Sequence, residues 1–186
     1  MSVSGVAVAL GANLGDPAAT LLAVRPRLEE AVAEWWPGAA GRWSPRFRTA
    51  PVGGPPGQPP YLNAVALFTA APPPPADPLP LLHRLQALER RFGRRRRIRW
   101  GPRRLDLDLL WCGEQCRSGP ELQLPHPRLV GRCFVLAPLA AIDPALVPPG
   151  QAEVPPRPCG ALLASLQRGG PEPPPLRLPP APGWPE

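Results

Sequence analysis

Runs of apolar residues and their spacing predict alternating strands and helices along the first half of the chain. Residues 3–10 form a short valine-rich run that ends at a glycine, which is typical of a buried strand. Residues 16–36 then carry apolar side chains at helical spacing, and Pro26 should kink this helix or delay its start because proline lacks the amide donor. We expect a second strand over residues 42–48 and an exposed loop, rich in proline and glycine, over residues 50–60.

The pattern continues with a strand, a helix and another strand. Residues 61–70 have the composition of a strand, which a run of prolines ends. Asp77 is a suitable N-cap, Pro78 suits the first helical position, and Gly93 ends the apolar helical spacing that follows. Residues 106–111 alternate as the next strand, and a glycine turn after them leads into a further short strand.

This order of elements predicts the fold class. Strand, helix, strand, strand, helix, strand is the order of a ferredoxin-like α+β sandwich, an antiparallel sheet with helices packed on its faces. A chain of 186 residues is long enough for one well-buried core and too short for two ordinary enzyme domains. We therefore expect one domain over residues 1–147. Residues 148–186 are dense in proline, and we expect a largely disordered tail there with one short helix near 162–166.

Composition and charge narrow the class of protein less than the pattern does. The net charge is +7, and all 21 basic residues are arginine, beside 34 prolines. This bias resembles a coding bias, which weakens the case for nucleic-acid binding, although a basic surface still attracts a polyanion such as a nucleotide. The chain shows neither a charged signal-peptide start nor an apolar run of about 18 residues, so we expect a cytoplasmic protein with no membrane partner. The four cysteines lack paired C-x-x-C spacing, and we expect reduced, mostly structural thiols.

The most informative stretch is Arg99-Trp-Gly-Pro-Arg-Arg-Leu-Asp-Leu-Asp108. Successive side chains of a strand point to opposite faces, so Asp106 and Asp108 should share one face while the leucines enter the core. Two carboxylates on one rigid surface suit Mg²⁺, which takes one or two protein carboxylates and completes its shell with water and substrate phosphates. The arginines upstream would bind those phosphates. The stretch therefore predicts a site for a polyphosphate and a metal.

Each of these signals has a simpler interpretation in isolation. Alternating Asp and Leu residues occur in any half-exposed strand. An arginine run such as residues 94–97 is more often a solvated loop than a site. His126 between two prolines fits a turn, and Tyr61 and Phe134 fit a core. The interpretation as a site depends on the combination of these signals.

Five segments, taken together, resemble the 6-hydroxymethyl-7,8-dihydropterin pyrophosphokinase family of the folate pathway. The distinctive string is Trp-Gly-Pro-Arg-x-Leu-Asp-Leu-Asp, and the order of all five segments along the chain agrees with the family. The resemblance implies a ferredoxin-like fold and transfer of pyrophosphate from ATP to the hydroxymethyl group of a reduced pterin, with release of AMP. The segments are residues 9–16, 47–51, 61–65, 93–108 and 124–136.

The resemblance also implies roles for individual residues. Asp106 and Asp108 would hold two Mg²⁺ ions with the ATP phosphates, and Arg94 and Arg103 would complete the catalytic set. The implied ATP-binding residues are Gln86, Glu89, Arg94, Arg96, Trp100, Arg103, Leu109, His126 and Arg132. The implied pterin-binding residues are Asn13, Thr49, Val52, Tyr61, Asn63, Trp100 and Phe134, with Tyr61 and Phe134 stacking on the flat ring.

Two other functions remain open at this point. An RNA-recognition module is also built on a four-stranded α+β sheet with aromatic and basic residues, but its aromatic strand motif is absent from this sequence, and paired carboxylates would repel a phosphate backbone. A metal-dependent nuclease or phosphatase would use the same Asp106 and Asp108, but it needs a general base that the sequence does not identify. We therefore expect ATP and a reduced pterin as ligands, no nucleic-acid partner, and a monomer.

Overall fold

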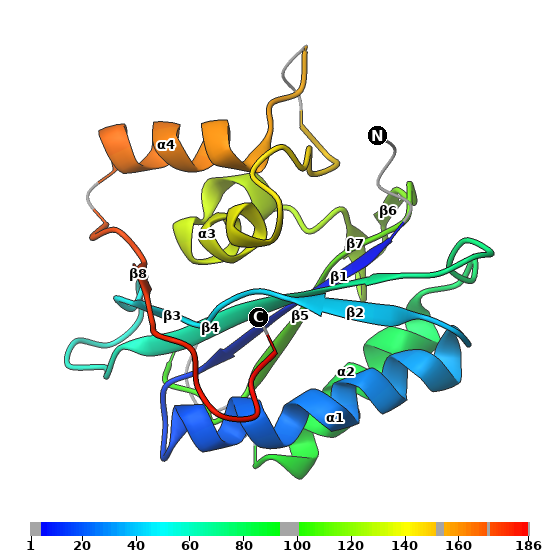
Figure 1. Cartoon of the computed structure of the whole chain (residues 1–186), viewed down its shortest axis with the longest axis horizontal. Coiled ribbons are helices and arrows are strands. Elements are labelled where there is room, and N and C mark those ends of the chain that lie inside the picture. The colour runs from blue at the N-terminus through cyan, green and yellow to red at the C-terminus, as the bar shows by residue number, and fades with distance from the viewer. Residues whose placement is uncertain (1–4, 94–100, 152–154, 171, 186) are drawn as a thin grey trace.

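The chain folds around an antiparallel sheet, with α1 and α2 on one face, α3 on the other, and α4 packed on the outer side of α3 (Figure 1). The computed structural model describes residues 5–93, 101–151, 155–170 and 172–185. Three predicted site residues, Arg94, Arg96 and Trp100, lie outside these ranges. The elements are β1 (Val6–Ala12), α1 (Pro17–Trp35), β2 (Ala40–Trp43), β3 (Phe47–Thr49), β4 (Tyr61–Thr69), α2 (Leu79–Arg91), β5 (Asp106–Cys112), β6 (Arg117–Ser118), β7 (Gln123–Leu124), a 3₁₀ turn (Leu129–Gly131), α3 (Cys133–Ile142), α4 (Cys159–Gly169) and β8 (Leu176–Arg177).

The main sheet has the strand order β5-β1-β4-β3-β8, and β2 also pairs with β4. Every pairing is antiparallel, which confirms the predicted ferredoxin-like α+β class. The register places Gly11 of β1 between Asn63 of β4 and Asp106 of β5. It places Ala9 beside Asp108 in the same way. Residues from three strands therefore meet at one end of the sheet.

The two helices predicted between the strands are present. Asp16 caps α1, and its Oδ1 accepts a hydrogen bond from the backbone N–H of Ala19 at 3.0 Å. Pro26 lies inside α1, and the helix starts at Pro17, so the expected delay of its start is wrong. The buried face of α1, which includes Leu21 and Leu28, packs on the sheet and supports the helix despite the missing hydrogen bond.

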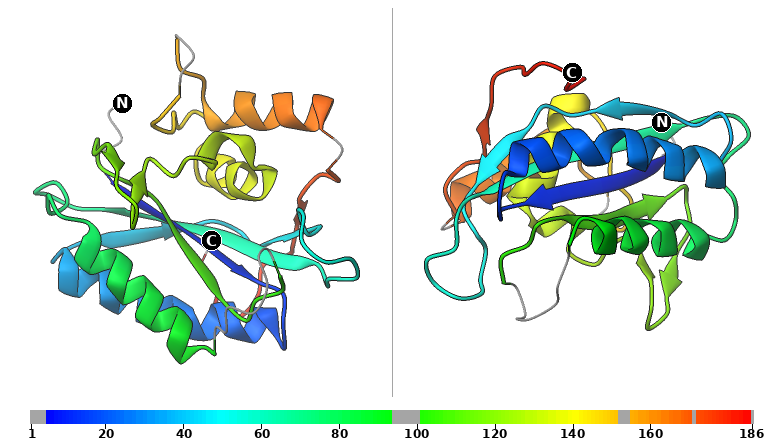
Figure 2. Two further views of the ribbon diagram at one scale, coloured as in Figure 1. Left: turned by 180° about the vertical axis from the view of Figure 1, so that it is seen from behind. Right: turned by 90° about the horizontal axis from the view of Figure 1, so that it is seen from below.

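Helix α2 starts one residue later than predicted. Pro78 is its N-cap, and Asp77 still contributes, because its Oδ1 accepts a hydrogen bond from the N–H of Leu79 at 3.2 Å. Gly93 follows the helix with a φ of 82°, a left-handed conformation that glycine adopts at low cost. In Figure 2, α1 and α2 lie side by side under the sheet.

The strand predicted over residues 42–48 is in fact two strands, β2 and β3. Ser44 interrupts them, because its Oγ accepts the backbone N–H of Val65 at 2.9 Å while its own N–H donates to the carbonyl of Val65 at 2.9 Å. A side chain thus replaces a backbone carbonyl in the ladder and breaks the strand locally. Both short strands still pair with β4.

The sheet divides the hydrophobic core into two parts. Between the sheet and the helices α1 and α2, the core contains Leu10, Leu85, Leu107 and Leu109 among others. On the opposite face, Leu136 of α3 packs over Val65, Leu110 and Trp111 of the sheet, and α4 adds Leu162 to the same cluster. Helix α3 provides most of the apolar cover on this face.

Helix α4 and strand β8 lie in the segment whose composition predicts a largely disordered tail. Helix α4 packs on α3 through Cys159 and Leu162, and it contains the short helix expected near 162–166. Strand β8 pairs with β3, and Trp184 is buried in the core under α1. A few well-spaced apolar residues anchor this segment in spite of its proline content.

Most of the cysteine thiols of the chain are buried. All four cysteines are free, and Cys112, Cys133 and Cys159 are buried while Cys116 is exposed. Burial raises the pKa of Cys112 to about 11, so this thiol stays protonated at neutral pH. Among the described helices, none has the length and apolar character needed to cross a bilayer.

Candidate active site

A cleft of about 280 Å³ opens on the sheet beside α3, at the end where β1, β4 and β5 meet. Most of the predicted site residues that the structure describes surround it. The β1–β5 pair forms its floor, the loop after β3 forms one wall, and the segment leading into α3 forms the other. The lining residues are Ala9, Leu10, Gly11, Ala50, Pro51, Val52, Gly53, Tyr61, Asn63, Arg103, Asp106, Asp108, His126, Arg132 and Phe134.

Two carboxylates stand on the floor of this cleft, as the alternation in β5 predicts. Asp106 and Asp108 are partly exposed, whereas Leu107 and Leu109 between and after them are buried in the core under α1 and α2. The strand is thus anchored through one face and presents both acids on the other. Gly11 and Ala9, directly beside them in the ladder, are small enough to leave the carboxylates accessible.

Each carboxylate has an arginine partner. Nη1 of Arg103 lies 2.5 Å from Oδ2 of Asp106, and Nη1 of Arg132 lies 3.5 Å from Oδ2 of Asp108. Burial on its own would lower the pKa of Arg103, but attraction and hydrogen bonding to Asp106 outweigh it and leave that pKa raised. Burial lowers the pKa of Arg132, and Asp108 offsets this only in part. Both guanidinium groups remain charged, since arginine does not lose its proton in proteins.

His126 faces the same charges as a neutral imidazole. Burial, followed by the positive charges of Arg132 and Arg128, lowers its pKa to about 4. Its Nδ1 accepts a hydrogen bond from the backbone N–H of Arg128 at 3.1 Å, so the neutral ring carries its proton on Nε2. The backbone N–H of His126 donates to the carbonyl of Leu110 at 2.7 Å and ties this segment to β5. The ring can therefore donate one hydrogen bond through Nε2 to an anion.

Two aromatic side chains line the other part of the cleft. The hydroxyl of Tyr61 donates to the carbonyl of Gly101 at 3.2 Å. Burial raises the pKa of Tyr61, with Arg103 opposing the shift and Asp106 adding to it. The guanidinium carbon of Arg132 lies 5.3 Å from the centroid of the Phe134 ring, a cation–π distance. Flat apolar surfaces of this kind suit a flat heterocycle.

A buried polar pair lies beside these rings. Nδ2 of Asn63 donates to Oγ1 of Thr49 at 2.7 Å, and both side chains are almost fully buried. A Cβ atom added at Gly11 would come within 2.9 Å of Oδ1 of Asn63. Glycine at this position therefore leaves the Asn63 amide room to occupy its place in the cleft, where its polar atoms can select a ligand.

Asn13 lies behind the cleft, where it fixes the backbone around Arg103. Its Oδ1 accepts the N–H of Arg103 at 2.7 Å, its Nδ2 donates to the carbonyl of Pro59 at 3.0 Å, and its own N–H donates to the carbonyl of Arg103 at 2.9 Å. These bonds join the turn after β1, the loop before β4 and the segment before β5. Asn13 thus supports the cleft without lining it.

Three predicted ATP-binding residues do not line the cleft. Glu89 is 2% exposed, and its Oε1 accepts the backbone N–H of Leu107 at 2.8 Å, so it contacts β5 from the side of α2. Leu109 is buried in the core on the same side. Gln86 is half-buried on α2. Sequence reasoning in turn gave no role in the cleft to Ala9, Gly11, Ala50, Pro51 and Gly53, although all but Gly53 lie in the segments 9–16 and 47–51 that resemble the family.

The donor set in the cleft fits magnesium. Two carboxylates lie on one face of one strand, and arginines that can bind phosphate stand next to them. Magnesium prefers such a partial oxygen shell, which a polyphosphate and water complete. Within the described ranges, no group of three or more His, Cys, Asp and Glu side chains gathers into a metal site. The two carboxylates alone supply part of an oxygen shell, which fits a magnesium ion that phosphate oxygens also coordinate.

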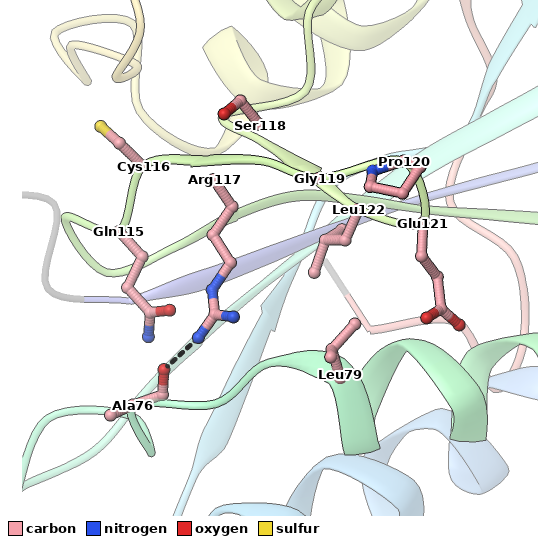
Figure 3. Close-up of a pocket in the computed structure, with 10 residues that line it drawn as sticks. All are labelled: Ala76, Leu79, Gln115, Cys116, Arg117, Ser118, Gly119, Pro120, Glu121 and Leu122. Carbon is pink, nitrogen blue, oxygen red and sulfur yellow. Dashed lines mark hydrogen bonds between the residues drawn. The ribbon is translucent and has the colours of Figure 1, made fainter.

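A second and wider hollow, of about 700 Å³, lies between the start of α2 and the β6–β7 hairpin (Figure 3). Its charged side chains are engaged with neighbouring protein groups. Nη2 of Arg117 donates to the carbonyl of Ala76 at 2.9 Å, as Figure 3 shows, and Glu121 lies 2.7 Å from Nε2 of His83. Most of the predicted site residues that the structure describes line the other cleft, which we take as the candidate active site.

The molecule is an α+β sandwich in which paired carboxylates, arginines and flat aromatic rings surround one cleft. Residues 7–144 match the family model described as 7,8-dihydro-6-hydroxymethylpterin-pyrophosphokinase. The chain belongs to this family, which confirms the resemblance drawn from its motifs.

Curated relatives support the same membership. The 2-amino-4-hydroxy-6-hydroxymethyldihydropteridine pyrophosphokinase of Pseudomonas aeruginosa is 40% identical over 153 residues, which cover 82% of this chain and 89% of the relative. Proteins of the same name from Synechocystis and Mycobacterium tuberculosis are each 38% identical. The Synechocystis match covers 78% of this chain and 69% of the relative, and the Mycobacterium tuberculosis match covers 87% of this chain and 84% of the relative.

Proposed function

We propose that this chain transfers the pyrophosphoryl group of ATP to the hydroxymethyl oxygen of 6-hydroxymethyl-7,8-dihydropterin and releases AMP, a step of folate biosynthesis. The hydroxymethyl oxygen attacks the β-phosphorus of ATP and gives up its proton, and the bond from that phosphorus to the α-phosphate oxygen breaks, so that AMP leaves with that oxygen. The observation that carries the proposal is a single cleft that combines paired carboxylates and arginines with two aromatic rings.

The charged half of the cleft binds the triphosphate in this proposal. Arg103 and Arg132 neutralise the phosphate oxygens, and His126 donates a hydrogen bond from Nε2. Asp106 and Asp108 would hold magnesium, which, when bound, neutralises charge on the phosphates and aligns the reacting oxygens. We propose two ions, since the transferred pyrophosphoryl group contains two phosphates, and the negative charge on the oxygens of both must be neutralised. Of the remaining predicted ATP-binding residues, Arg94 and Arg96 belong to the same proposal and lie outside the described residues.

The other half of the cleft binds the pterin. Tyr61 and Phe134 supply aromatic surface on which the flat ring can stack. Asn63, held by Thr49, offers amide groups to the polar edge of the ring, and Val52 closes the wall from the loop. A ligand that lacks the matching donors and acceptors would leave this buried amide unsatisfied, which disfavours it.

The chemistry in this proposal consists mainly of positioning and charge neutralisation. Phosphoryl transfer needs the attacking and leaving oxygens in line and the negative charge balanced, and it requires little covalent chemistry from the protein. The rigid strand β5 and the hydrogen bonds of Asn13 fix the acids and the Arg103 backbone before any ligand binds. Such preorganisation favours the transition state because less reordering is needed during the reaction.

The test is AMP formation from ATP with the reduced pterin, with and without Mg²⁺. We expect AMP that depends on both the pterin and the metal, without ADP. ADP in place of AMP would indicate transfer of a single phosphoryl group, and no nucleotide product from a folded sample would overturn the proposal. The number of ions is tested by the Mg²⁺ dependence of the rate at fixed ATP, and the proposed monomer by light scattering during gel filtration.

A further inference from the structure

The last described segment of the chain, residues 172–185, wraps around one edge of the sheet. In Figure 1 it leaves the side of α4, passes β3 as β8, and ends on the side of α1. Strand β8 pairs with β3, with Arg177 opposite Phe47 and Leu176 opposite Arg48. Helix α4 contributes Leu162 to the core on one face, whereas Trp184 belongs to the core on the other. We call residues 172–185 the C-terminal clasp.

Trp184 anchors the C-terminal clasp. It is the one buried residue of residues 172–185, with 7% of its surface exposed. Its ring packs edge-on against Trp43, with 5.4 Å between centroids. Its Nε1 donates a buried hydrogen bond to the carbonyl of Ser44 at 2.9 Å. The indole thus contacts β2 through its ring and the connection between β2 and β3 through its N–H.

The same connection is held at Arg46. The N–H of Leu178 donates to the carbonyl of Arg46 at 2.8 Å, and Nη2 of Arg46 donates to the carbonyl of Pro179 at 3.3 Å. The Arg46 guanidinium also lies 5.9 Å from the centroid of the Trp184 ring. Arg46 is buried, so these contacts with the C-terminal clasp form a large part of its surroundings. Removing the clasp would expose both this residue and the edge of β3.

Strand β3 leads directly into the cleft. It has three residues, and its last, Thr49, accepts the hydrogen bond from Asn63. Residues 50–53, which follow, form a wall of the cleft. A strand of three residues is marginally stable if it pairs on one side only. Strand β3 pairs with β4 on one side and with β8 on the other. The position of Thr49 and of the wall therefore depends on contacts from the opposite end of the chain.

We propose that the C-terminal clasp is a positioning element for the pterin half of the cleft, with Trp184 as its positioning residue. This inference rests on the proposed function, since it assigns the wall at residues 50–53 to the pterin. The clasp acts through β3 and touches neither half of the cleft itself. Its loss should weaken pterin binding and leave ATP binding, which depends on β5 and the segment before α3, largely unchanged.

The experiment compares Trp184→Ala with Trp36→Ala in the full chain. Trp36 is a matched control because it is 2% exposed in the same core and its Nε1 also donates to a backbone carbonyl, that of Pro72 at 3.0 Å. We expect Trp184→Ala to raise the KM for the pterin by about tenfold, a factor typical of lost buried contacts, with the KM for ATP unchanged. Trp36→Ala should lower the melting temperature and leave both KM values unchanged.

Two further measurements keep the inference testable if Trp184→Ala does not fold or if the chain shows no turnover. Trp184→Phe keeps an aromatic ring but removes the N–H donor, and we expect a smaller rise in the same KM, about threefold. Amide hydrogen exchange needs no substrate, and it should become faster at residues 47–53 in both Trp184 variants but not in Trp36→Ala. Equal exchange at residues 47–53 in the variants of both tryptophans, or parallel rises in both KM values, would overturn the inference without bearing on the proposed reaction.

Discussion

Asp108 and Arg132 meet across the cleft, with 3.5 Å between Oδ2 and Nη1. Asp106 and Arg103 form a second pair of the same kind on the same floor. The two pairs bring two negative and two positive groups to one small volume, so a ligand that carries both phosphates and a metal ion finds partners for each. Because both acids belong to one strand, whose other face is buried, their spacing is set by the backbone and not by flexible side chains.

We predict that Asp106→Ala and Asp108→Ala each abolish AMP formation while the fold remains intact. Losing a metal ligand should cost several kcal/mol of transition-state stabilisation, which corresponds to about 10³-fold or more in rate. Asp143→Ala is the control, because Asp143 follows α3 outside the cleft and binds the N–H of Ala145. AMP release measures the activity, and circular dichroism measures whether the fold remains intact. Activity near that of the unmodified chain in either cleft variant would contradict the metal assignment.

We predict that Gly11→Ala weakens pterin binding. Its Cβ would stand 2.9 Å from Oδ1 of Asn63, so the amide must move and its hydrogen bond to Thr49 weakens. We expect the KM for the pterin to rise by about tenfold, the effect of one disturbed buried hydrogen bond. Gly169→Ala is the control, because an added Cβ there meets no atom within 4 Å. An unchanged KM in Gly11→Ala would show that Asn63 does not select the pterin.

We predict that Tyr61 ionises above the ordinary tyrosine pKa of 10.0, chiefly because it is buried. It is the single tyrosine of the chain, so the ultraviolet absorbance of tyrosinate in an alkaline titration reports on this residue alone. Asp106 raises this pKa and Arg103 lowers it, so Asp106→Asn should shift the midpoint down and Arg103→Gln should shift it up. Shifts in the opposite directions would mean that Tyr61 does not face these two charges.

We predict that His126 makes the protein less stable in mild acid. Its pKa is about 4 in the folded chain and near the ordinary value of 6.5 in the unfolded chain, so the unfolded state binds the proton first as pH falls. The free energy of unfolding therefore decreases between pH 6.5 and about pH 4. Urea unfolding of the unmodified chain and of His126→Gln measures this, and the difference should move in favour of the variant across that interval. If the free energy of unfolding changed with pH in the same way in both proteins, His126 would be exposed to solvent and the prediction would be wrong.

Nuclear magnetic resonance gives a direct check on the same residue. The chain has two histidines, so His83→Gln assigns the two imidazole signals. The His126 signal should titrate near pH 4, and its Nε2 should carry the proton above that pH, because the Arg128 N–H occupies Nδ1. A proton on Nδ1 would contradict the hydrogen bond on which the anion-binding role of the ring depends.

The strand that carries the acids could be predicted from the sequence because its signal is local. Alternating aspartate and leucine fixes which side chains face the core, and this pattern needs no distant partner. The cleft residues of β4 and of the segment before α3 were identified by motif, since Tyr61, Asn63 and His126 belong to strings that recur in the family. Gly11 and Ala9 also belong to a segment that resembles the family, but the motif gave them no role of their own, because they matter through the side chains that they do not have.

The interruption at Ser44 and the C-terminal clasp could not be predicted in this way. Ser44 breaks a strand by accepting the N–H of Val65, a contact between residues that only the fold brings together. Trp184 lies far along the sequence from Trp43, in a proline-rich stretch whose composition favours disorder. A single buried tryptophan produces no periodic pattern of apolar residues, so the pattern does not predict that this segment is anchored.

The hydrogen bond from the Leu107 N–H to Glu89 has a consequence for how copies of the chain meet one another. Strand β5 is an edge of the sheet, and exposed edges recruit strands from other molecules. Glu89 occupies the amide of Leu107, and the N–H of His126 occupies the carbonyl of Leu110, so backbone groups at this edge are already used. The opposite edge is β8, which is only two residues long. The sheet thus leaves few free backbone groups along β5 and only a short edge at β8, which discourages strand addition at these two strands.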